Sequence, residues 1–149
     1  MIIKKIPFAS KTYEEMKRLR EDILRLPLGL KLSDDDIKGE DTQIHIAAIG
    51  DGGSIVGTIL LKPLSKHRAK LRQMAVLPTL QHRGIGRKLV STAEESARTM
   101  GFTIIELHAR IYAKGFYEKL GYQMEGDTFI EVNLPTAKMI KHITPLSPD

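Results

Sequence analysis

A strand, a basic turn and an amphipathic helix follow one another over residues 71–100, and this unit constrains the fold more than any other part of the chain. The run Leu71–Val76 is typical of a β-strand, and Pro78 ends it. A stripe of apolar residues spaced three or four apart then predicts a helix over 83–100, with Gly101 beyond its end. The stripe consists of Ile85, Leu89, Ala93, Ala97 and Met100. Such a β–α unit is typical of folds that pack helices on a sheet.

The turn that joins this strand to this helix is predicted to bind an anion. The first N–H groups of a helix have no partner within the helix, and glycines at 84 and 86 let an oxygen approach them closely. Arg83, Arg87 and Lys88 add positive charge at the helix start, which is unfavourable by up to about 1 kcal/mol unless an anion offsets it. The alternative is a loosened helix start with a solvated basic face. The sequence has no P-loop motif, and Leu89 stands where the G-x-G-x-x-G fingerprint needs its third glycine.

The rest of the chain alternates short strands with helices. Thr12 is expected to start the first helix through a capping box with Glu15, and Gly50–Gly53 is typical of a hairpin turn. Residues 28–42 are expected to form a polar loop with at most one helical turn. The predicted strands are 2–6, 44–49, 55–61, 103–109, 122–125 and 128–132, and the predicted helices are 13–26 and 112–120.

This order of elements predicts an α/β or α+β fold with helices on both faces of one sheet. A chain of 149 residues buries enough surface to fold without a disulfide or a metal, so a single domain over 1–149 is expected. Residues 143–149 carry Pro145 and Pro148 and are expected to form a frayed tail.

The composition excludes several classes of protein. The absence of cysteine excludes disulfide scaffolds, thiol nucleophiles, zinc–thiolate sites and iron–sulfur clusters, and no metal site is predicted. A formal charge of +5 is typical of a protein with an anionic partner. Nucleic acid is an alternative partner, but aromatic residues make up only 5% of the chain and no nucleic-acid-binding motif is present, so none is expected. Lys4 and Lys5 interrupt the apolar start, and no run of about 20 apolar residues exists, so we expect a cytoplasmic protein without a membrane partner.

Two motifs resemble those of the GNAT N-acetyltransferase superfamily. The run Gln81-His82-Arg83-Gly84-Ile85-Gly86 is similar to its Q/R-x-x-G-x-G/A signature, and Leu107–Gly121 resembles its second motif. The resemblance covers residues 40–140. A further likeness to the ElaA/YjcF-like branch rests on Leu28-Gly29, His45, Leu107-His108-Ala109 and Phe129–Pro135. That branch usually has an acidic residue and a glycine where this chain has Val132-Asn133, and a histidine where it has Thr136.

The resemblance implies a mixed sheet of about seven strands that is splayed between the fourth strand, Leu71–Val76, and the fifth, Thr103–Ala109. It also implies acetyl-CoA as cosubstrate. Backbone groups of the fourth strand would pair with the pantetheine arm, and amides of the turn would hold the pyrophosphate. The cofactor-binding residues implied are Met74, Ala75, Val76, Gln81, His82, Arg83, Gly84, Ile85, Gly86, Arg87 and Lys88.

The reaction implied is direct transfer of an acetyl group to a primary amine in a ternary complex, and the lack of cysteine fits this because no thiol acyl-enzyme can form. Neutralising an alkyl ammonium of pKa near 10.4 at pH 7 takes about 4–5 kcal/mol, so a base is needed. Tyr117 resembles the family's general acid by its position. Glu106 and His108 share one face of the fifth strand and are candidate bases, and His45 is a third.

The alternative is a non-catalytic acyl-CoA-binding regulatory domain, because Arg72 and Gln73 stand where many relatives have an acidic residue on the fourth strand. The expected acceptor is a small-molecule or peptide amine. A homodimer is also implied, because members of this family are often dimers. A second basic cluster, Lys66, Arg68 and Lys70, has no role in this prediction.

Overall fold

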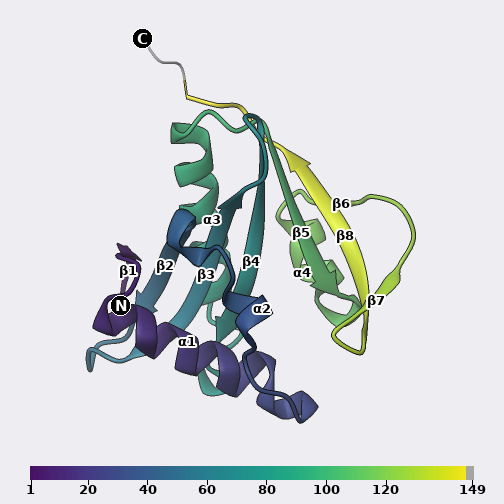
Figure 1. Ribbon diagram of the computed structural model, residues 1–149. Helices are drawn as coiled ribbons and strands as arrows, with labels where there is room; N and C mark the ends of the chain where they lie inside the picture. The colour runs from purple at the N-terminus through teal and green to yellow at the C-terminus, as the bar shows by residue number, and fades with distance from the viewer. Residues whose placement is uncertain (147–149) are drawn as a thin grey trace. The chain divides into compact units, whose positions relative to one another are not determined.

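The computed structural model describes residues 1–146, whose strands form an eight-stranded mixed sheet (Figure 1). The strand order is β1-β2-β3-β4-β5-β8-β6, and β7 also pairs with β8. The chain divides into two compact units, one made of Met1–Lys62 with Gln73–Ala93, the other of Pro63–Arg72 with the residues from Glu94 onward. The predicted mixed α/β fold is therefore confirmed, with one strand more than expected.

The first unit packs helices on both faces of an antiparallel set of strands. On one face, Tyr13, Met16 and Leu19 of α1 are buried against Ala47 of β2 and Leu60 of β3. Its elements are β1 (Ile2–Ile6), α1 (Lys11–Leu24), α2 (Asp34–Ile37), β2 (Ile44–Ile49), β3 (Ile55–Pro63), the end of β4 (Arg68–Val76) and the start of α3 (Ile85–Thr99). The predicted helix 13–26 is thus confirmed with shifted ends, and Leu26 lies beyond α1 with 48% of its surface exposed.

The opposite face of this unit brings α3 unusually close to the sheet at Gly57. A Cβ atom at this position would lie 3.0 Å from Leu89 Cδ1 and 3.3 Å from the carbonyl oxygen of Ala75. No side chain fits there without moving its neighbours. The glycine therefore allows the start of α3 and the end of β4 to pack directly on β3.

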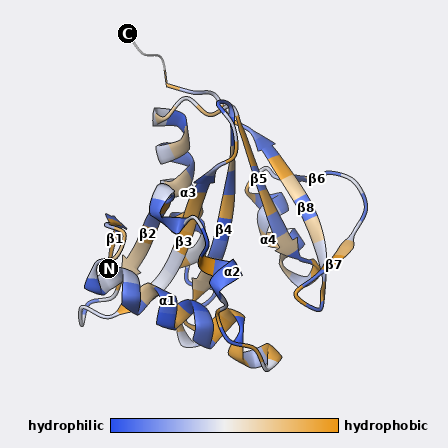
Figure 2. Cartoon of the chain, in the orientation of Figure 1, coloured by the Kyte–Doolittle hydropathy of each residue, from blue (hydrophilic) through white to orange (hydrophobic). Residues whose placement is uncertain are grey.

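The second unit is built around β8, which pairs with three other strands. It runs antiparallel to β5 along the whole length of β5, from Ile104 to Arg110. Parallel pairing of β4 with β5 covers only Arg68–Leu71 and Ile104–Leu107, although both strands continue further. Figure 2 shows hydrophilic and hydrophobic residues alternating along β4 and β5, so one face is polar and one apolar. The remaining elements are α4 (Lys114–Lys119), β6 (Gln123–Met124), β7 (Phe129–Glu131) and β8 (Leu134–His142).

Several element boundaries differ from the prediction. The capping box at Thr12 is wrong, because the side chain of Ser10 caps α1 by accepting a hydrogen bond from the Tyr13 amide at 3.1 Å. Strand β8 was not predicted. Its neighbour Ile143 donates a backbone hydrogen bond to Thr103, and Leu146 donates one to Arg98, while 147–149 of the expected frayed tail lie outside the described residues. No helix within residues 1–146 is long and apolar enough to cross a bilayer.

Asp36 gives the first unit an acid-sensitive contact. Its carboxylate accepts two hydrogen bonds from Arg25, at 2.9 and 3.1 Å, and one from the Ser33 amide at 2.9 Å. Burial alone would raise the pKa of Asp36, but these hydrogen bonds outweigh it and lower the pKa to about 2. Because the folded-state pKa lies below the usual 3.8, the carboxylate stabilises the fold above pH 4, and this stability is lost as the pH falls towards 2.

We therefore expect wild-type protein to lose about 1–2 kcal/mol more unfolding free energy than Asp36→Asn between pH 5 and pH 2. Urea unfolding of both proteins at the two pH values measures this difference. Parallel losses in the two proteins would show that Asp36 does not contribute.

Candidate active site

The predicted anion-binding turn lies in the first unit and ends at an uncapped helix start. Helix α3 begins at Ile85, two residues later than predicted, and the Lys88 amide donates to the carbonyl oxygen of Gly84 at 3.1 Å. Gly84 has a φ of +84°, in the left-handed region that favours glycine. No described residue accepts a hydrogen bond from the amides of residues 85–87. The turn thus leaves the first N–H groups of α3 available to an anion.

The rest of the turn supports this arrangement. A short turn at Pro78–Leu80 follows β4, and the Gln81 side chain donates to the carbonyl oxygen of Val76 at 3.2 Å, which ties the turn to the strand end. His82 also has a positive φ, of 65°. The predicted residues Gln81–Lys88 therefore run from the turn into the first residues of α3, and Leu77–Leu80 separate them from Met74–Val76 at the end of β4. The side chains of Gln81, His82, Arg83, Arg87 and Lys88 are exposed.

In the second unit, the polar face of β4 and β5 carries a chain of charged side chains. His108 Nδ1 lies 2.8 Å from Glu131 Oε2 of β7 and 3.4 Å from the Lys70 ammonium. When Glu131 accepts the Nδ1 proton, the lone pair is on Nε2. The ring of Phe129 meets the imidazole edge to face at a centroid distance of 5.2 Å. These contacts orient an imidazole that remains 21% exposed, so it can reach a substrate.

The two other candidate bases are engaged in the structure. Glu106 is 7% exposed and accepts a hydrogen bond from Arg68 at 2.7 Å, so a guanidinium already occupies its carboxylate. His45 is 2% exposed, and its Nε2 lies 2.7 Å from the carbonyl oxygen of Glu40. It also packs edge to face on Tyr13 in the core of the first unit. Of the three candidates, His108 has the most exposed side chain.

Tyr117 lies on α4 with its side chain 8% exposed. Its ring packs at 4.9 Å from Phe116 and 5.9 Å from Tyr122. The hydroxyl forms no hydrogen bond with any described residue. Burial raises the pKa of Tyr117, so the phenol keeps its proton at neutral pH and can donate it in a hydrogen bond.

Sequence reasoning assigned no role to Glu131 or Arg110. Arg110 donates to the Glu131 carbonyl oxygen and, at 3.0 Å, to the Thr136 hydroxyl, so it fixes the strand that carries the carboxylate. Glu131 lies in the run Phe129–Pro135, which the sequence likeness already singled out. Its pairing with His108 could not be predicted, because it depends on how β7 pairs with β8 and β8 with β5.

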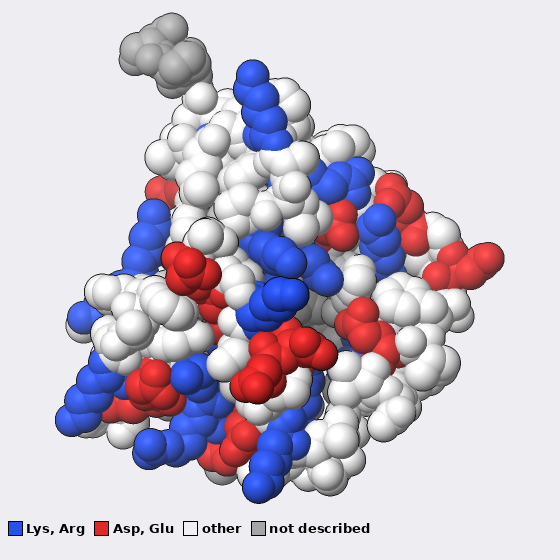
Figure 3. All heavy atoms as spheres, viewed as in Figure 1, with Lys and Arg blue, Asp and Glu red and all other residues white. Residues whose placement is uncertain are grey.

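The structure also gives partners to two residues of the second basic cluster. Arg68 and Lys70 contact Glu106 and His108, whereas Lys66 is exposed. Figure 3 shows lysine and arginine side chains interspersed with acidic ones on the face in view. The net charge therefore does not form one continuous basic patch on that face.

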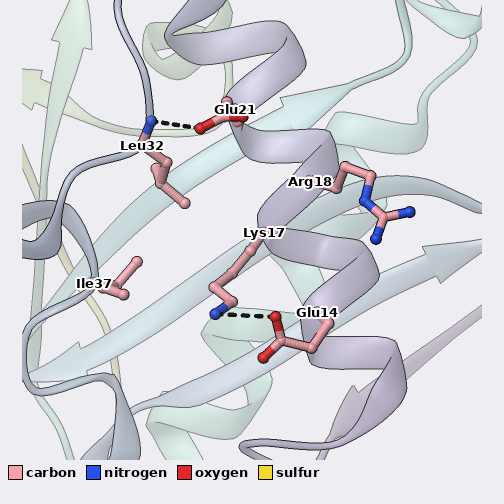
Figure 4. Close-up of a pocket in the computed structure, with 6 residues that line it drawn as sticks. All are labelled: Glu14, Lys17, Arg18, Glu21, Leu32 and Ile37. Carbon is pink, nitrogen blue, oxygen red and sulfur yellow. Dashed lines mark hydrogen bonds and ion pairs between the residues drawn. The ribbon is translucent and has the colours of Figure 1, made fainter.

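A further hollow lies beside α1 and contains no residue of the predicted site. It has a volume of about 270 Å³ and is lined by Glu14, Lys17, Arg18, Glu21, Leu32 and Ile37 (Figure 4). Glu21 accepts a hydrogen bond from the Leu32 amide at 2.8 Å, and Glu14 pairs with Lys17 at 3.1 Å. Glu14 and Lys17 are thus paired along the helix, and Glu21 is held by the backbone of Leu32.

The chain is similar to known proteins in sequence and in fold. An uncharacterised Bacillus subtilis protein, YyaT, is 38% identical over 78 residues, which are 52% of this chain and 53% of that protein. This chain therefore aligns with only about half the length of that relative. Escherichia coli ElaA has a TM-score of 0.81 at 17% identity, over 95% of this chain and 99% of that one. An aminoglycoside 6′-N-acetyltransferase complexed with coenzyme A has a TM-score of 0.77 at 23% identity, with 100% of both chains covered.

At these identities the two solved structures show a shared fold, and the predicted likeness to ElaA is confirmed at that level. The model of the acetyltransferase (GNAT) family matches residues 10–122, which include the turn at 81–88 and Tyr117. The chain therefore belongs to the GNAT acetyltransferase family.

Proposed function

We propose that the protein is an acetyl-CoA-dependent N-acetyltransferase that transfers the acetyl group directly to a primary amine in a ternary complex. The observation that carries the proposal is the turn at Gln81–Lys88, which combines uncapped helix amides with exposed basic side chains. Family membership and the coenzyme A bound to a protein of the same fold support an acyl-CoA as the ligand.

The chain's own residues fit the cosubstrate. Two phosphate groups need several donors, and residues 85–87 offer three N–H groups with no partner among the described residues. Arg83, Arg87 and Lys88 add charge next to them, and the backbone of Met74–Val76 would pair with the pantetheine arm. The cosubstrate supplies an activated acetyl thioester when bound.

In this proposal His108 and Tyr117 move the protons. An ammonium acceptor gives up two protons as its nitrogen forms the new C–N bond, and the C–S bond breaks with the electron pair on sulfur. His108 Nε2 accepts a proton from the acceptor nitrogen, while Glu131 holds Nδ1. The Tyr117 hydroxyl donates a hydrogen bond to the departing sulfur, and if its proton passes to the sulfur, one of the two protons released by the amine restores the hydroxyl. One proton ends on the coenzyme A thiol and the other passes to solvent.

Titration calorimetry with acetyl-CoA, followed by thiol release against a panel of amines, tests the proposal. The panel should contain an aminoglycoside, a simple alkyl amine and a lysine peptide, with mass spectrometry of the product. Saturable binding and amine-dependent thiol release are expected. Absence of binding at millimolar acetyl-CoA would refute the proposal.

Binding without transfer to any amine would favour the non-catalytic acyl-CoA-binding domain. The observation that favours this second function is the sequence of the fourth strand, where Arg72 and Gln73 provide no carboxylate. Thiol release therefore distinguishes the two functions, whereas calorimetry of acetyl-CoA binding does not.

Gly84→Ala should weaken acetyl-CoA binding about tenfold. A left-handed conformation at a non-glycine residue is unfavourable by about 1–2 kcal/mol, and relaxing it would turn the first amides of α3. The matched control is Gly53→Ala, because Gly53 has a φ of +86° in the hairpin between β2 and β3. Calorimetry should show lower affinity for the first variant only. Equal affinities in the two variants would contradict a role for Gly84 in the site.

A further inference from the structure

Two charged side chains are fully enclosed in the first unit. Arg20 of α1 and Glu40 have no exposed side-chain surface. They form a two-point ion pair, with Nη1 donating to Oε1 at 2.9 Å and Nη2 to Oε2 at 2.6 Å. The Tyr13 hydroxyl donates to the same Oε1 at 2.7 Å. Desolvation offsets most of the attraction in such a pair, so stability alone is a weak reason for it.

Arg20 has a third contact, and it reaches β4. Its Nε donates to Gln73 Oε1 at 3.0 Å. Gln73 stands inside the strand with a φ of 54°, in the left-handed region. Its carbonyl oxygen accepts a hydrogen bond from the Thr58 hydroxyl of β3 at 3.0 Å. Gln73 is therefore held through its side chain by α1 and through its backbone by β3.

The conformation of Gln73 decides how the next residues present their backbone. A left-handed residue inside a strand rotates the peptide groups that follow it and interrupts regular pairing. The residues that follow are Met74–Val76. Glutamine has no intrinsic preference for this region, unlike glycine or asparagine, so the surrounding contacts must impose it.

We propose that Arg20 and Glu40 are positioning residues that hold Gln73 in its left-handed conformation. In this way they direct the N–H and C=O groups of Met74–Val76 towards the pantetheine arm of the cosubstrate. This inference rests on the proposed function, because it takes Met74–Val76 as the segment that binds that arm. The pyrophosphate is assigned to the separate turn at 81–88. Loss of the positioning residues should therefore lower kcat much more than cosubstrate affinity.

The test replaces all three side chains of the buried network together, so that neither Arg20 nor Glu40 alone loses the other. The triple variant Tyr13→Phe, Arg20→Met, Glu40→Leu replaces the polar groups with apolar ones of similar size. A fourth change, Gln73→Gly, is then added, because glycine adopts a positive φ without an anchor. The double variant Arg25→Met, Asp36→Asn removes another ion pair of the same unit, Arg25 Nη2 to Asp36 Oδ1 at 2.9 Å, and controls for a general loss of stability.

In the triple variant kcat should fall about 10–100-fold, with the Kd for acetyl-CoA within about threefold of wild type. Adding Gln73→Gly to the triple variant should raise kcat again by about tenfold. The Arg25/Asp36 control should keep kcat. A triple variant with wild-type kcat would overturn the inference, as would parallel losses of kcat and affinity without rescue by glycine.

A second readout separates this inference from the proposed function. The backbone amide resonances of Met74, Ala75 and Val76 should shift when coenzyme A is added to the wild type, shift less in the triple variant, and recover with Gln73→Gly. If the wild type binds coenzyme A but acetylates no amine, the proposed activity fails and these shifts decide the positioning role. A wild type that binds no coenzyme A overturns both.

Discussion

Replacing His108 by glutamine should lower kcat by about 10²–10⁴-fold, the largest effect expected for any single side chain in this protein. Glutamine keeps the size of the imidazole and removes the nitrogen lone pair that accepts the proton. Glu131→Gln should cost less, about tenfold, because Glu131 acts by holding His108 Nδ1 at 2.8 Å. Steady-state thiol release with a saturating amine measures both effects.

The same experiment decides between the candidate bases. His67→Gln changes an exposed histidine of the same unit and should leave kcat as in the wild type. Glu106→Gln should lower stability because it removes the negative charge that pairs with Arg68, with a smaller effect on kcat than His108→Gln. A loss of activity in Glu106→Gln with near wild-type activity in His108→Gln would make Glu106 the base.

Tyr117→Phe should lower kcat about 10²-fold while KM for acetyl-CoA changes less than about threefold. The aromatic ring and its packing on Phe116 remain, and only the hydroxyl is lost, which forms no hydrogen bond with any described residue. Tyr112→Phe is the matched control, because Tyr112 lies just before α4 with 84% of its surface exposed. Equal kcat in wild type and Tyr117→Phe would remove Tyr117 from the mechanism.

The pH dependence adds a second check on Tyr117. Burial raises the pKa of the phenol above the usual 10.0, so the hydroxyl stays protonated throughout the neutral and mildly alkaline range. Activity should therefore not fall between pH 8 and pH 10 through ionisation of this group. A decline in that range that disappears in Tyr117→Phe would show that the group ionises earlier. A phenol of raised pKa is also a weak acid, so stabilising the developing thiolate by a hydrogen bond is its main contribution.

The elements that local pattern predicts well carry a strong signal of their own. The stripe of α3 repeats with the helical period, whereas β1 and β2 are short runs rich in isoleucine, and the structure places all three within two residues of the predicted ends. Strand β8 escaped prediction because Pro135 and Lys138 interrupt its apolar pattern, and three partner strands rather than its own composition make it a strand.

Part of the candidate site could be predicted from the sequence and part could not. The turn at 81–88 is a contiguous motif, so its residues could be named from the sequence. The link from His108 to Glu131 joins residues 23 positions apart, and the link from Arg20 to Gln73 joins residues 53 positions apart. Arg20 stands four residues after Met16 and seven after Tyr13, on the apolar face of α1, where an arginine gives no local sign that it is enclosed.

The arrangement of β8 bears on how this protein can be shortened. Because β8 lies between β5 on one side and β6 and β7 on the other, a chain that stopped before Leu134 would leave β5 with an unpaired edge along its whole length. An open, largely apolar edge strand of this kind is a template for pairing with other chains. Such a truncated protein would still contain the matched family segment at 10–122, yet we expect it to aggregate.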